Sequence, residues 1–345
     1  MSQEHQARIG FVGAGNHATE SLYPNIAHIP AFHLAAVCDL DPDRAQGAKE
    51  RFGAERSFTD VEAMLAEVPL DGVCVCGPPS MHHEVALVCL GKGIPVFVEK
   101  PPAEDLAGAI ELASLAEKKN IFGMVGFMKR FAPANRVALE FMGTERFGRL
   151  SAVSLIHGSG PYEDPRKMML FNGIHMVDLA FFLGGAINSL SAIGTAWDHD
   201  TKALVAQFQY QNGAVGCLNM NSGHHWRDCF EQAYVSGAGT GLLIDASRSV
   251  EIMGEGMRFA DGEGLELFGW SGKYSVSGNM AGWFASGHYT RGYWGELQQF
   301  ALACLGEAEP VPSLRDGVQA IRFIESALQS AEAHGETVPL LGDAS

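Results

Sequence analysis

The stretch Arg8–Ala18, which reads RIGFVGAGNHA, decides the fold of the first part of the chain. A compact apolar run typical of a β-strand leads into the pattern G-x-G-x-x-A. Gly13 permits a tight turn from strand to helix, Gly15 lets an anion approach the backbone, and Ala18 lets the helix pack on the strand. The N–H groups that begin the expected helix, His17–His28, attract negative charge. The stretch therefore predicts a nucleotide-binding turn.

An acidic residue stands where such a turn needs one. Asp39 follows the second apolar run, Leu34–Cys38. It lies about 20 residues after the turn, where a carboxylate can bind the ribose hydroxyls of a dinucleotide. Because a carboxylate there repels a 2′-phosphate, the sequence favours NAD over NADP. The glycine pattern alone is a weak signal. It becomes informative because Asp39 and the flanking strand and helix accompany it.

The first third of the chain alternates strand and helix patterns. Five short runs are apolar along their whole length, as strands buried on both faces of a parallel sheet must be. These runs are Arg8–Val12, Leu34–Cys38, Gly72–Cys76, Ile94–Val98 and Ile121–Gly126. Helical patterns lie at His17–His28, Asp43–Phe52, Asp60–Glu67, His82–Lys92 and Glu104–Lys118. The alternation predicts an α/β domain with a doubly wound parallel sheet.

The later part of the chain is richer in strands. Strand-like runs occur at Leu150–His157, Ala203–Tyr210, Val215–Met220, Cys229–Ser236 and Gly241–Ile244. Helical patterns occur at Gly173–Leu183, Gly292–Leu305 and Leu314–Ala333. Asn212-Gly213 between two strand-like runs predicts a hairpin, since both residues tolerate positive φ. Gly254–Gly282 is rich in glycine and fits either a loop or a β-meander.

We expect two domains. An α/β domain covers residues 1–125, and an α+β domain with a mostly antiparallel sheet covers residues 126–345, with a last helix able to pack back on the first domain.

Composition and charge exclude several classes of protein. Among 345 residues, Asp and Glu number 40 against 24 Lys and Arg, a formal net charge of -16. Such a surface repels phosphate backbones and anionic lipid, so nucleic acids and membranes are poor partners. No apolar run approaches the ~18 residues that span a bilayer, and the polar first residues do not resemble a signal peptide. Seven cysteines, several within apolar runs, predict a reduced, cytoplasmic protein without a disulfide framework.

Further motifs follow the glycine turn in a recognisable order. Glu99-Lys100-Pro101 ends the fourth apolar run. The other motifs are Gly77-Pro78-Pro79-Ser80-Met81-His82, Gly126-Phe127-Met128-Lys129-Arg130-Phe131-Ala132-Pro133, Gly173–Leu179 and Tyr293–Phe300. Over nearly the full length, the chain resembles the Gfo/Idh/MocA family of oxidoreductases. The resemblance implies a Rossmann domain, a second domain with an open, largely antiparallel sheet, and a substrate cleft between them.

The resemblance also implies roles for individual residues. Lys100 matches the family's lysine beside the nicotinamide, and His175 matches its histidine on the first helix of the second domain, so we predict both to be catalytic. The predicted contacts with NAD are Gly13, Gly15, Asn16, His17, Asp39, Pro78, His82, Glu99 and Lys100. The predicted contacts with substrate are Arg130, His157, Tyr162, Asn172 and His175.

Structural alternatives remain open for several of these residues. His175 could be a core histidine, Asn172 a helix cap, and Arg130 part of an inter-domain salt bridge. Many family members carry Asp four residues before the histidine, where this chain has Phe171. Asp178 lies one helical turn after His175 and could orient its imidazole or only pack.

The predicted function is that of an NAD(H)-dependent oxidoreductase. It would interconvert a secondary alcohol and a ketone on a sugar, a cyclitol or a related polyhydroxy compound. One alternative is an enzyme that uses tightly bound NAD transiently, as in glycoside cleavage, and another is a catalytically impaired NAD-binding regulatory protein.

We expect no metal site and a homo-oligomer. Adjacent histidines, as in His82-His83 and His224-His225, point in different directions and chelate poorly. Cys74 and Cys76 face one side of a buried strand and fit the core. The alternation in Ala203–Tyr210 and Val215–Met220 gives an apolar face that needs covering, which favours a homodimer or homotetramer.

Overall fold

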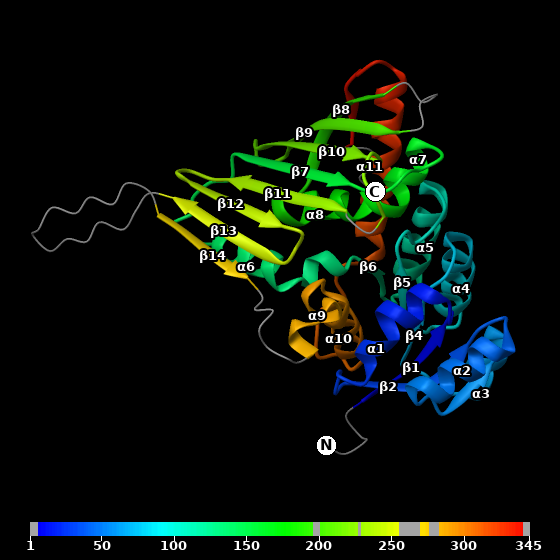
Figure 1. The fold of residues 1–345 in the computed structure, drawn as a ribbon. Helices are drawn as coiled ribbons and strands as arrows, with labels where there is room; N and C mark the ends of the chain where they lie inside the picture. The colour runs from blue at the N-terminus through cyan, green and yellow to red at the C-terminus, as the bar shows by residue number, and fades with distance from the viewer. Residues whose placement is uncertain (1–5, 196–200, 227–228, 255–269, 276–282, 341–345) are drawn as a thin grey trace, which may run out of the picture. The chain divides into compact units, whose positions relative to one another are not determined.

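The computed structural model describes residues 6–195, 201–226, 229–254, 270–275 and 283–340. The chain divides into two units (Figure 1). Unit 1 comprises Met1–Phe131 and Ser286–Ile321, and unit 2 comprises Ala132–Ala285 and Arg322–Ser345. Each expected domain, 1–125 and 126–345, is one continuous segment. In the structure, the chain returns to unit 1 late in the sequence. It returns because Leu297 and Phe300 lie in the core of unit 1.

Unit 1 is built on a six-stranded parallel sheet. Its strands are β1 (Ala7–Val12), β2 (Phe32–Cys38), β3 (Arg56–Phe58), β4 (Gly72–Val75), β5 (Val96–Glu99) and β6 (Gly123–Gly126). Their order is β3-β2-β1-β4-β5-β6, and every pair is parallel. The doubly wound sheet and its five expected strands are confirmed. β3 was not predicted, because it is short and its Arg56 is exposed.

Helices surround this sheet, and all but the short ones at Met128–Phe131 and Gly287–Thr290 fall at the predicted places. They are η2 (Ala18–Leu22), α1 (Tyr23–Ile26), α2 (Pro42–Phe52), α3 (Val61–Glu67), α4 (Pro79–Gly91), α5 (Leu106–Lys119), η3 (Met128–Phe131), α9 (Gly287–Thr290) and α10 (Tyr293–Cys304). Aspartates begin three of them: the side chains of Asp41, Asp60 and Asp105 accept backbone N–H groups of the first turns of α2, α3 and α5. Such caps satisfy donors that a helix cannot bond internally.

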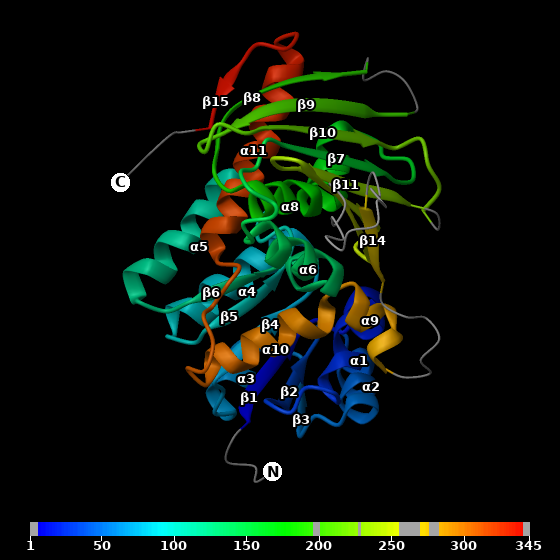
Figure 2. The ribbon, with the colours of Figure 1, turned by 90° about the vertical axis from the view of Figure 1, so that its left-hand side faces the viewer.

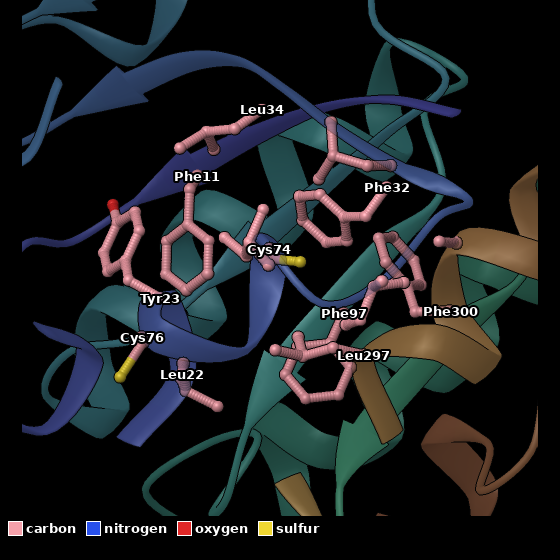
Figure 3. Packing of buried hydrophobic residues seen from close by; sticks show 14 of the residues in the cluster. Phe11, Leu22, Tyr23, Phe32, Leu34, Cys74, Cys76, Phe97, Leu297 and Phe300 are labelled. Carbon is pink, nitrogen blue, oxygen red and sulfur yellow. The ribbon is translucent and has the colours of Figure 1, made fainter. Parts of the chain in front are cut away.

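One face of the sheet packs against η2, α1 and α10 (Figure 3). Phe11 stacks on Tyr23 with ring centroids 4.2 Å apart, and Phe300 packs on Phe97 at 5.9 Å. Cys74 and Cys76 belong to this cluster, so the prediction of core cysteines is confirmed. All the cysteines are free, which confirms that the chain has no disulfide framework.

Unit 2 is built on a nine-stranded sheet (Figure 2). The strands are β7 (Ala152–Gly158), β8 (Ile187–Gly194), β9 (Ala203–Tyr210), β10 (Val215–Asn221), β11 (Phe230–Ser236), β12 (Thr240–Asp245), β13 (Ser249–Gly254), β14 (Trp270–Ser275) and β15 (Val338–Pro339). Their order is β14-β13-β12-β11-β7-β10-β9-β8-β15. The sheet is antiparallel apart from the parallel pair β7 and β10, so the mostly antiparallel sheet is confirmed.

Part of the glycine-rich stretch Gly254–Gly282 adopts a strand. β14 pairs with β13 in antiparallel fashion. Residues 255–269 and 276–282 lie outside the described residues.

The predicted hairpin joins β9 to β10, but its turn differs in type from the expected one. Gly213 N–H donates to Tyr210 O at 3.0 Å, and Gly213 takes a φ of 87° whereas Asn212 stays outside the positive-φ region. The Asn212 side chain accepts from Ala214 N–H and donates to Gly184 O, each at 3.0 Å. Asn212 therefore stabilises the turn through its amide rather than through a left-handed backbone.

The apolar face predicted for β9 and β10 is covered within unit 2, by α8 (Ile174–Gly184) and by the part of α11 (Leu314–Glu332) that begins at Arg322. Phe208 packs on Phe323 with centroids 5.4 Å apart, and the Tyr210 hydroxyl donates to Ala180 O at 3.1 Å. The expectation that this face needs a second subunit is therefore wrong. The opposite face carries an open hollow of about 530 Å³, lined by residues that include Ser154, Gln207 and Cys217.

Among the described helices, none combines the length and the apolar character that crossing a membrane requires.

Replacing Phe300 by Ala is expected to destabilise the protein by about 3–5 kcal/mol, since a fully buried ring leaves a cavity. Thermal and denaturant unfolding measure the loss. Gln299→Ala, at a partly exposed position of the same helix, is the control and should cost about 1 kcal/mol or less, the value of one hydrogen bond. Equal losses in the two variants would contradict the burial of Phe300.

Candidate active site

The turn between β1 and η2 admits only glycine at its first position. Gly13 has a φ of 102°, and an added Cβ would lie 1.9 Å from the carbonyl oxygen of Cys76. Gly13 N–H donates to Cys38 O at 2.8 Å, and Gly13 O accepts from the Tyr23 hydroxyl at 3.1 Å. The turn is therefore fixed against the ends of β2 and β4.

Gly15 is glycine for another reason. A Cβ there would meet no protein atom within 4 Å, so internal packing does not demand its small size. Asn16 and His17, which follow it, are exposed. Open space above a glycine backbone is what a pyrophosphate needs in order to approach, so the residues present fit a dinucleotide.

Asp39 has a structural task in addition to the predicted one. Its Oδ2 accepts Ala14 N–H at 2.7 Å, and its Oδ1 accepts Asp41 N–H at 3.0 Å. The carboxylate thus holds the glycine turn to the end of β2. Because each carboxylate oxygen can accept more than one bond, Asp39 can still accept from a ribose hydroxyl.

A charged cluster lies at the carboxyl end of β5. Glu99 ends the strand with 2% of its surface exposed, and Lys100 follows directly, with part of its surface exposed. Glu99 Oε2 accepts the backbone N–H of Lys100 at 3.1 Å. Glu99 Oε1 lies 3.8 Å from Nε2 of the half-exposed His17. The structure thus brings together three predicted residues of unit 1, His17, Glu99 and Lys100. A fourth, Gly13, belongs to the same turn as His17.

The surroundings of Glu99 and Lys100 shift the pKa values of both side chains. Burial lowers the pKa of Lys100, and the Glu99 carboxylate opposes this lowering. Burial alone would raise the pKa of Glu99, but His17, Lys100 and His82 outweigh it and hold that pKa below its usual value. The lowered pKa of Lys100 therefore arises mainly from desolvation.

His82 holds two loops together. Its Nε2 accepts Gly77 N–H at 2.8 Å, and its Nδ1 lies 2.8 Å from Pro101 O, which fixes the proton on Nδ1. Burial lowers its pKa and keeps the ring neutral. Since both ring nitrogens are occupied, His82 holds the loop that leads through Pro78 into α4.

Arg130 forms a salt bridge inside unit 1. Its Nη2 donates to Asp316 Oδ1 at 2.8 Å, and Asp316 Oδ2 also accepts from the Ser313 hydroxyl at 2.7 Å. The alternative expected for Arg130 was an inter-domain salt bridge, whereas both partners of this salt bridge lie in unit 1.

His157 belongs to a buried polar network of unit 2. It lies on β7, within the strand-like run Leu150–His157, and its Nδ1 is 3.7 Å from Glu231 Oε2. Glu231 Oε1 accepts from the Ser247 hydroxyl at 3.0 Å, and Ser247 accepts from Asn135 Nδ2 at 3.3 Å. Ser247 has a φ of 55°, a strained backbone for a residue with a side chain. Sequence reasoning missed Glu231, Ser247 and Asn135.

The helix that carries His175 starts earlier than predicted. α7 (Pro165–Met168), η4 (Met169–Gly173) and α8 form a continuous run, capped by Asp164, which accepts Lys167 N–H at 2.6 Å. Asn172 therefore lies inside the helical run, and its interpretation as a cap is wrong. His175 is buried, with Asp178 one turn later.

Tyr162 packs edge-on against Trp226 in unit 2, with ring centroids 5.0 Å apart. Burial raises the pKa of its phenol to about 12, so the hydroxyl keeps its proton near neutral pH.

Sequence reasoning also missed Glu296 in unit 1. It lies on α10 with 0% exposure, and burial together with Glu99 raises its pKa well above the usual value. The only signal was an acidic residue within the otherwise apolar face of Tyr293–Phe300.

Comparison with known families identifies the chain. Residues 7–127 match the family described as "Oxidoreductase family, NAD-binding Rossmann fold", and residues 168–340 match that family's C-terminal alpha/beta domain. The chain belongs to the Gfo/Idh/MocA oxidoreductase family. It is an NAD-dependent oxidoreductase, and the fit of the Gly13–Gly15 turn agrees with that cofactor.

Individual relatives are dehydrogenases. The chain is 27% identical over 229 residues to myo-inositol 2-dehydrogenase of Thermotoga maritima, an alignment covering 61% of this chain and 67% of the relative. It is 26% identical over 331 residues to D-apiose dehydrogenase of Paraburkholderia graminis, covering 90% and 84% of the two chains.

Solved structures share the fold. A dehydrogenase from Chromobacterium violaceum matches with a TM-score of 0.85 at 25% identity, covering 95% of this chain and 96% of that one. Levoglucosan dehydrogenase in complex with NADH matches with a TM-score of 0.82 at 19% identity, covering 97% and 99%.

The two glycines of the turn are expected to respond differently to substitution. Gly15→Val should leave the melting temperature nearly unchanged, because its side chain enters open space, and should weaken NADH binding at least about tenfold by blocking the pyrophosphate. Gly13→Ala should lower both stability and affinity. Fluorescence titration with NADH and thermal unfolding measure the two effects, and wild-type affinity in Gly15→Val would contradict the cradle.

Proposed function

We propose that this protein interconverts a secondary alcohol and a ketone on a sugar, a cyclitol or a related polyhydroxy compound, with NAD(H) as the redox partner. The observation that carries the proposal is Lys100, a lysine of lowered pKa at the carboxyl end of β5. Ligands of doubly wound sheets bind at that edge. The substrate class is supported by the relatives, which are named for myo-inositol and D-apiose.

Bound NAD supplies hydride exchange with the reacting carbon. Lys100 then handles the proton of the reacting oxygen. In alcohol oxidation, the neutral Lys100 amine accepts the hydroxyl proton. In ketone reduction, the ammonium donates it back. A lowered pKa brings Lys100 closer to the operating pH, where proton transfer in both directions is efficient. Glu99 fixes the backbone at Lys100 through their hydrogen bond.

Unit 2 supplies the proposed substrate contacts. His175, with Asn172 on the same helical run, would bind substrate hydroxyls, and His175 would assist the proton transfer. His157 and Tyr162 would add hydrogen bonds to further hydroxyls. For Arg130 we propose a structural role, since its guanidinium is engaged by Asp316.

Phe171, which stands where many family members carry Asp, does not support the alternative of a catalytically impaired protein. Phe171 is 37% exposed and lies in η4, whereas the cluster around Lys100 keeps its acidic and basic members. A working catalyst is the function that these residues favour.

Lys100→Met is expected to lower kcat about 10²- to 10⁴-fold, the usual worth of general acid–base catalysis, while NADH affinity changes little. The assay follows nicotinamide absorbance against a panel of polyols, cyclitols and keto-sugars. Lys92→Met, at an exposed lysine of the same unit, is the control and should retain full turnover. Full turnover by Lys100→Met would refute its catalytic role, and failure of the whole panel would refute the substrate class.

We further propose a homodimer or homotetramer formed through the sheet face of unit 2 that carries the open hollow. Large apolar side chains are exposed on that face: Ile193 by 62%, Val215 by 54% and Tyr234 by 42%. Val215→Lys should reduce the mass measured by sedimentation to that of a monomer. Val311→Lys, at an exposed position in unit 1, should not, and a monomeric wild-type protein would contradict the proposal.

A further inference from the structure

His157 lies next to the last residue of β7 in unit 2 and carries an unsatisfied imidazole. Only 7% of its surface is exposed, yet neither Nδ1 nor Nε2 has a hydrogen-bond partner among the described residues. Most buried polar groups in proteins are hydrogen-bonded, because leaving one unsatisfied is costly. The ring therefore has hydrogen-bonding capacity left for a bound molecule.

Glu231 stands directly opposite His157 in the sheet. β7 and β11 are antiparallel neighbours (Figure 2), and their register pairs these two residues. Side chains paired in this way project to the same face of a sheet. Glu231 Oε2 lies 3.7 Å from Nδ1 of His157, within ion-pair range and slightly longer than a hydrogen bond. Hydrogen bonds of active sites are often this long before substrate binds, and they shorten in the complex.

The neighbouring positions on this face are apolar. Leu155 on β7 pairs with Ala233 on β11, and both are buried. A buried ion pair is often no more stabilising than well-packed apolar residues of similar volume. Stability of the sheet therefore does not account for the choice of His157 and Glu231 at the end of the two strands.

The Glu231 carboxylate is also held by a second pair of residues. The Ser247 hydroxyl donates to Oε1 at 3.0 Å, and Asn135 Nδ2, on α6 (Pro133–Met142), donates to Ser247 Oγ at 3.3 Å. Ser247 and Asn135 are both buried. The two hydrogen bonds run toward the carboxylate, which accepts when it is ionised. They fix one carboxylate oxygen while the other, Oε2, faces the imidazole.

The turn that presents Ser247 is strained. Arg248 N–H donates to Asp245 O at 2.8 Å, which makes Ala246 and Ser247 the central residues of a β-turn between β12 and β13. Their φ values are 47° and 55°, where such turns normally carry glycine or asparagine. Glycine at position 247 would relieve the strain but would lack the hydroxyl. Strain of this kind is characteristic of functional sites, so we attribute the serine to its hydrogen bond with Glu231.

We propose that Glu231 is a positioning residue of the substrate site, which holds a proton on Nδ1 of His157 so that Nε2 accepts a hydrogen bond from a substrate hydroxyl. The inference rests on the proposed contact between His157 and substrate. Either nitrogen of a neutral imidazole can carry the proton, so a fixed acceptor at Nδ1 decides which nitrogen the substrate meets. An acceptor nitrogen binds a hydroxyl and disfavours a carbonyl or ether oxygen at that place. Glu231 itself does not touch substrate.

The first test needs no substrate. Two-dimensional NMR of the full chain with ¹⁵N-labelled histidines reports which ring nitrogen carries a proton, and His157→Gln identifies the signals of His157. At pH 8, above the ordinary imidazole pKa of about 6.5, we expect a proton on Nδ1 in the wild type. Glu231→Met lacks the acceptor and should move that proton to Nε2, whereas Glu231→Gln keeps an oxygen acceptor and should retain it on Nδ1.

Two spectra would overturn the proposal. One is a wild-type spectrum in which Nδ1 carries no proton. The other is a proton that stays on Nδ1 in Glu231→Met.

The second test uses steady-state kinetics with a substrate found among the polyols, cyclitols and keto-sugars. Glu231→Met should raise KM at least about tenfold, roughly the worth of one hydrogen bond. It should change kcat less than about threefold, because the lost contact serves ground state and transition state alike. Glu231→Gln should raise KM less. Gln232→Met, on the other face of β11, is the matched control and should leave both constants unchanged.

The β12–β13 turn supplies a further matched pair of variants. Ala246→Gly and Ser247→Gly relieve the same kind of backbone strain, but only the second removes the hydroxyl. KM should rise in Ser247→Gly, whereas Ala246→Gly should keep the wild-type KM and melt at or above the wild-type temperature. An unchanged KM in Glu231→Met, an equal rise in the two glycine variants, or a rise in Gln232→Met would contradict the positioning role.

Thermal unfolding and NADH titration verify that each variant is folded. If none of the polyols, cyclitols and keto-sugars is turned over, the proposed function fails, but the NMR spectrum still decides where His157 holds its proton. Failure of the proposed function and failure of this inference are therefore distinguishable.

Discussion

The close contact between Gly13 and the end of β4 is the constraint on which the site depends. The Cys76 carbonyl lies where a side chain at position 13 would be. This contact holds the β1 turn beside the loop that leads into α4. His82 then ties that loop to Pro101, next to Lys100. A series of short contacts thus connects the glycine turn to Lys100 across three strands. A change in the size of most residues in this series would disturb both the turn and the lysine.

Much of the fold followed from the sequence where burial was uniform. β4 and β5 are buried along their whole length, so their apolar runs were unambiguous. β3 and β15 escaped prediction because short edge strands keep exposed residues and leave no periodic pattern. The helix before His175 was placed too late, because its π segment and the Asp164 cap lie outside the apolar motif that signalled it.

The candidate site was predicted unevenly for a similar reason. The glycines, Asp39 and Lys100 stand in local motifs that carry their own physical explanation. Glu296 is separated from Glu99 by almost 200 residues and sits on a helix where a single acid suggests a solvated position. Only the fold shows that α10 returns to unit 1. Likewise, Ser247 donates a hydrogen bond to Glu231 from a turn with a strained backbone. Nothing in the composition of that turn indicates the strain.

The return of the chain has a consequence for how the protein is made. A ribosome releases residues 1–131 long before Ser286–Ile321 emerges, and until then the Rossmann sheet lacks the aromatic and aliphatic cover that α10 provides. One face of the sheet in the nascent first segment is therefore incompletely shielded while strands β7 to β14 of unit 2 are synthesised. Maturation of the nucleotide-binding half is thus tied to the final stages of translation, so a prematurely terminated chain would be poorly protected from aggregation and proteolysis.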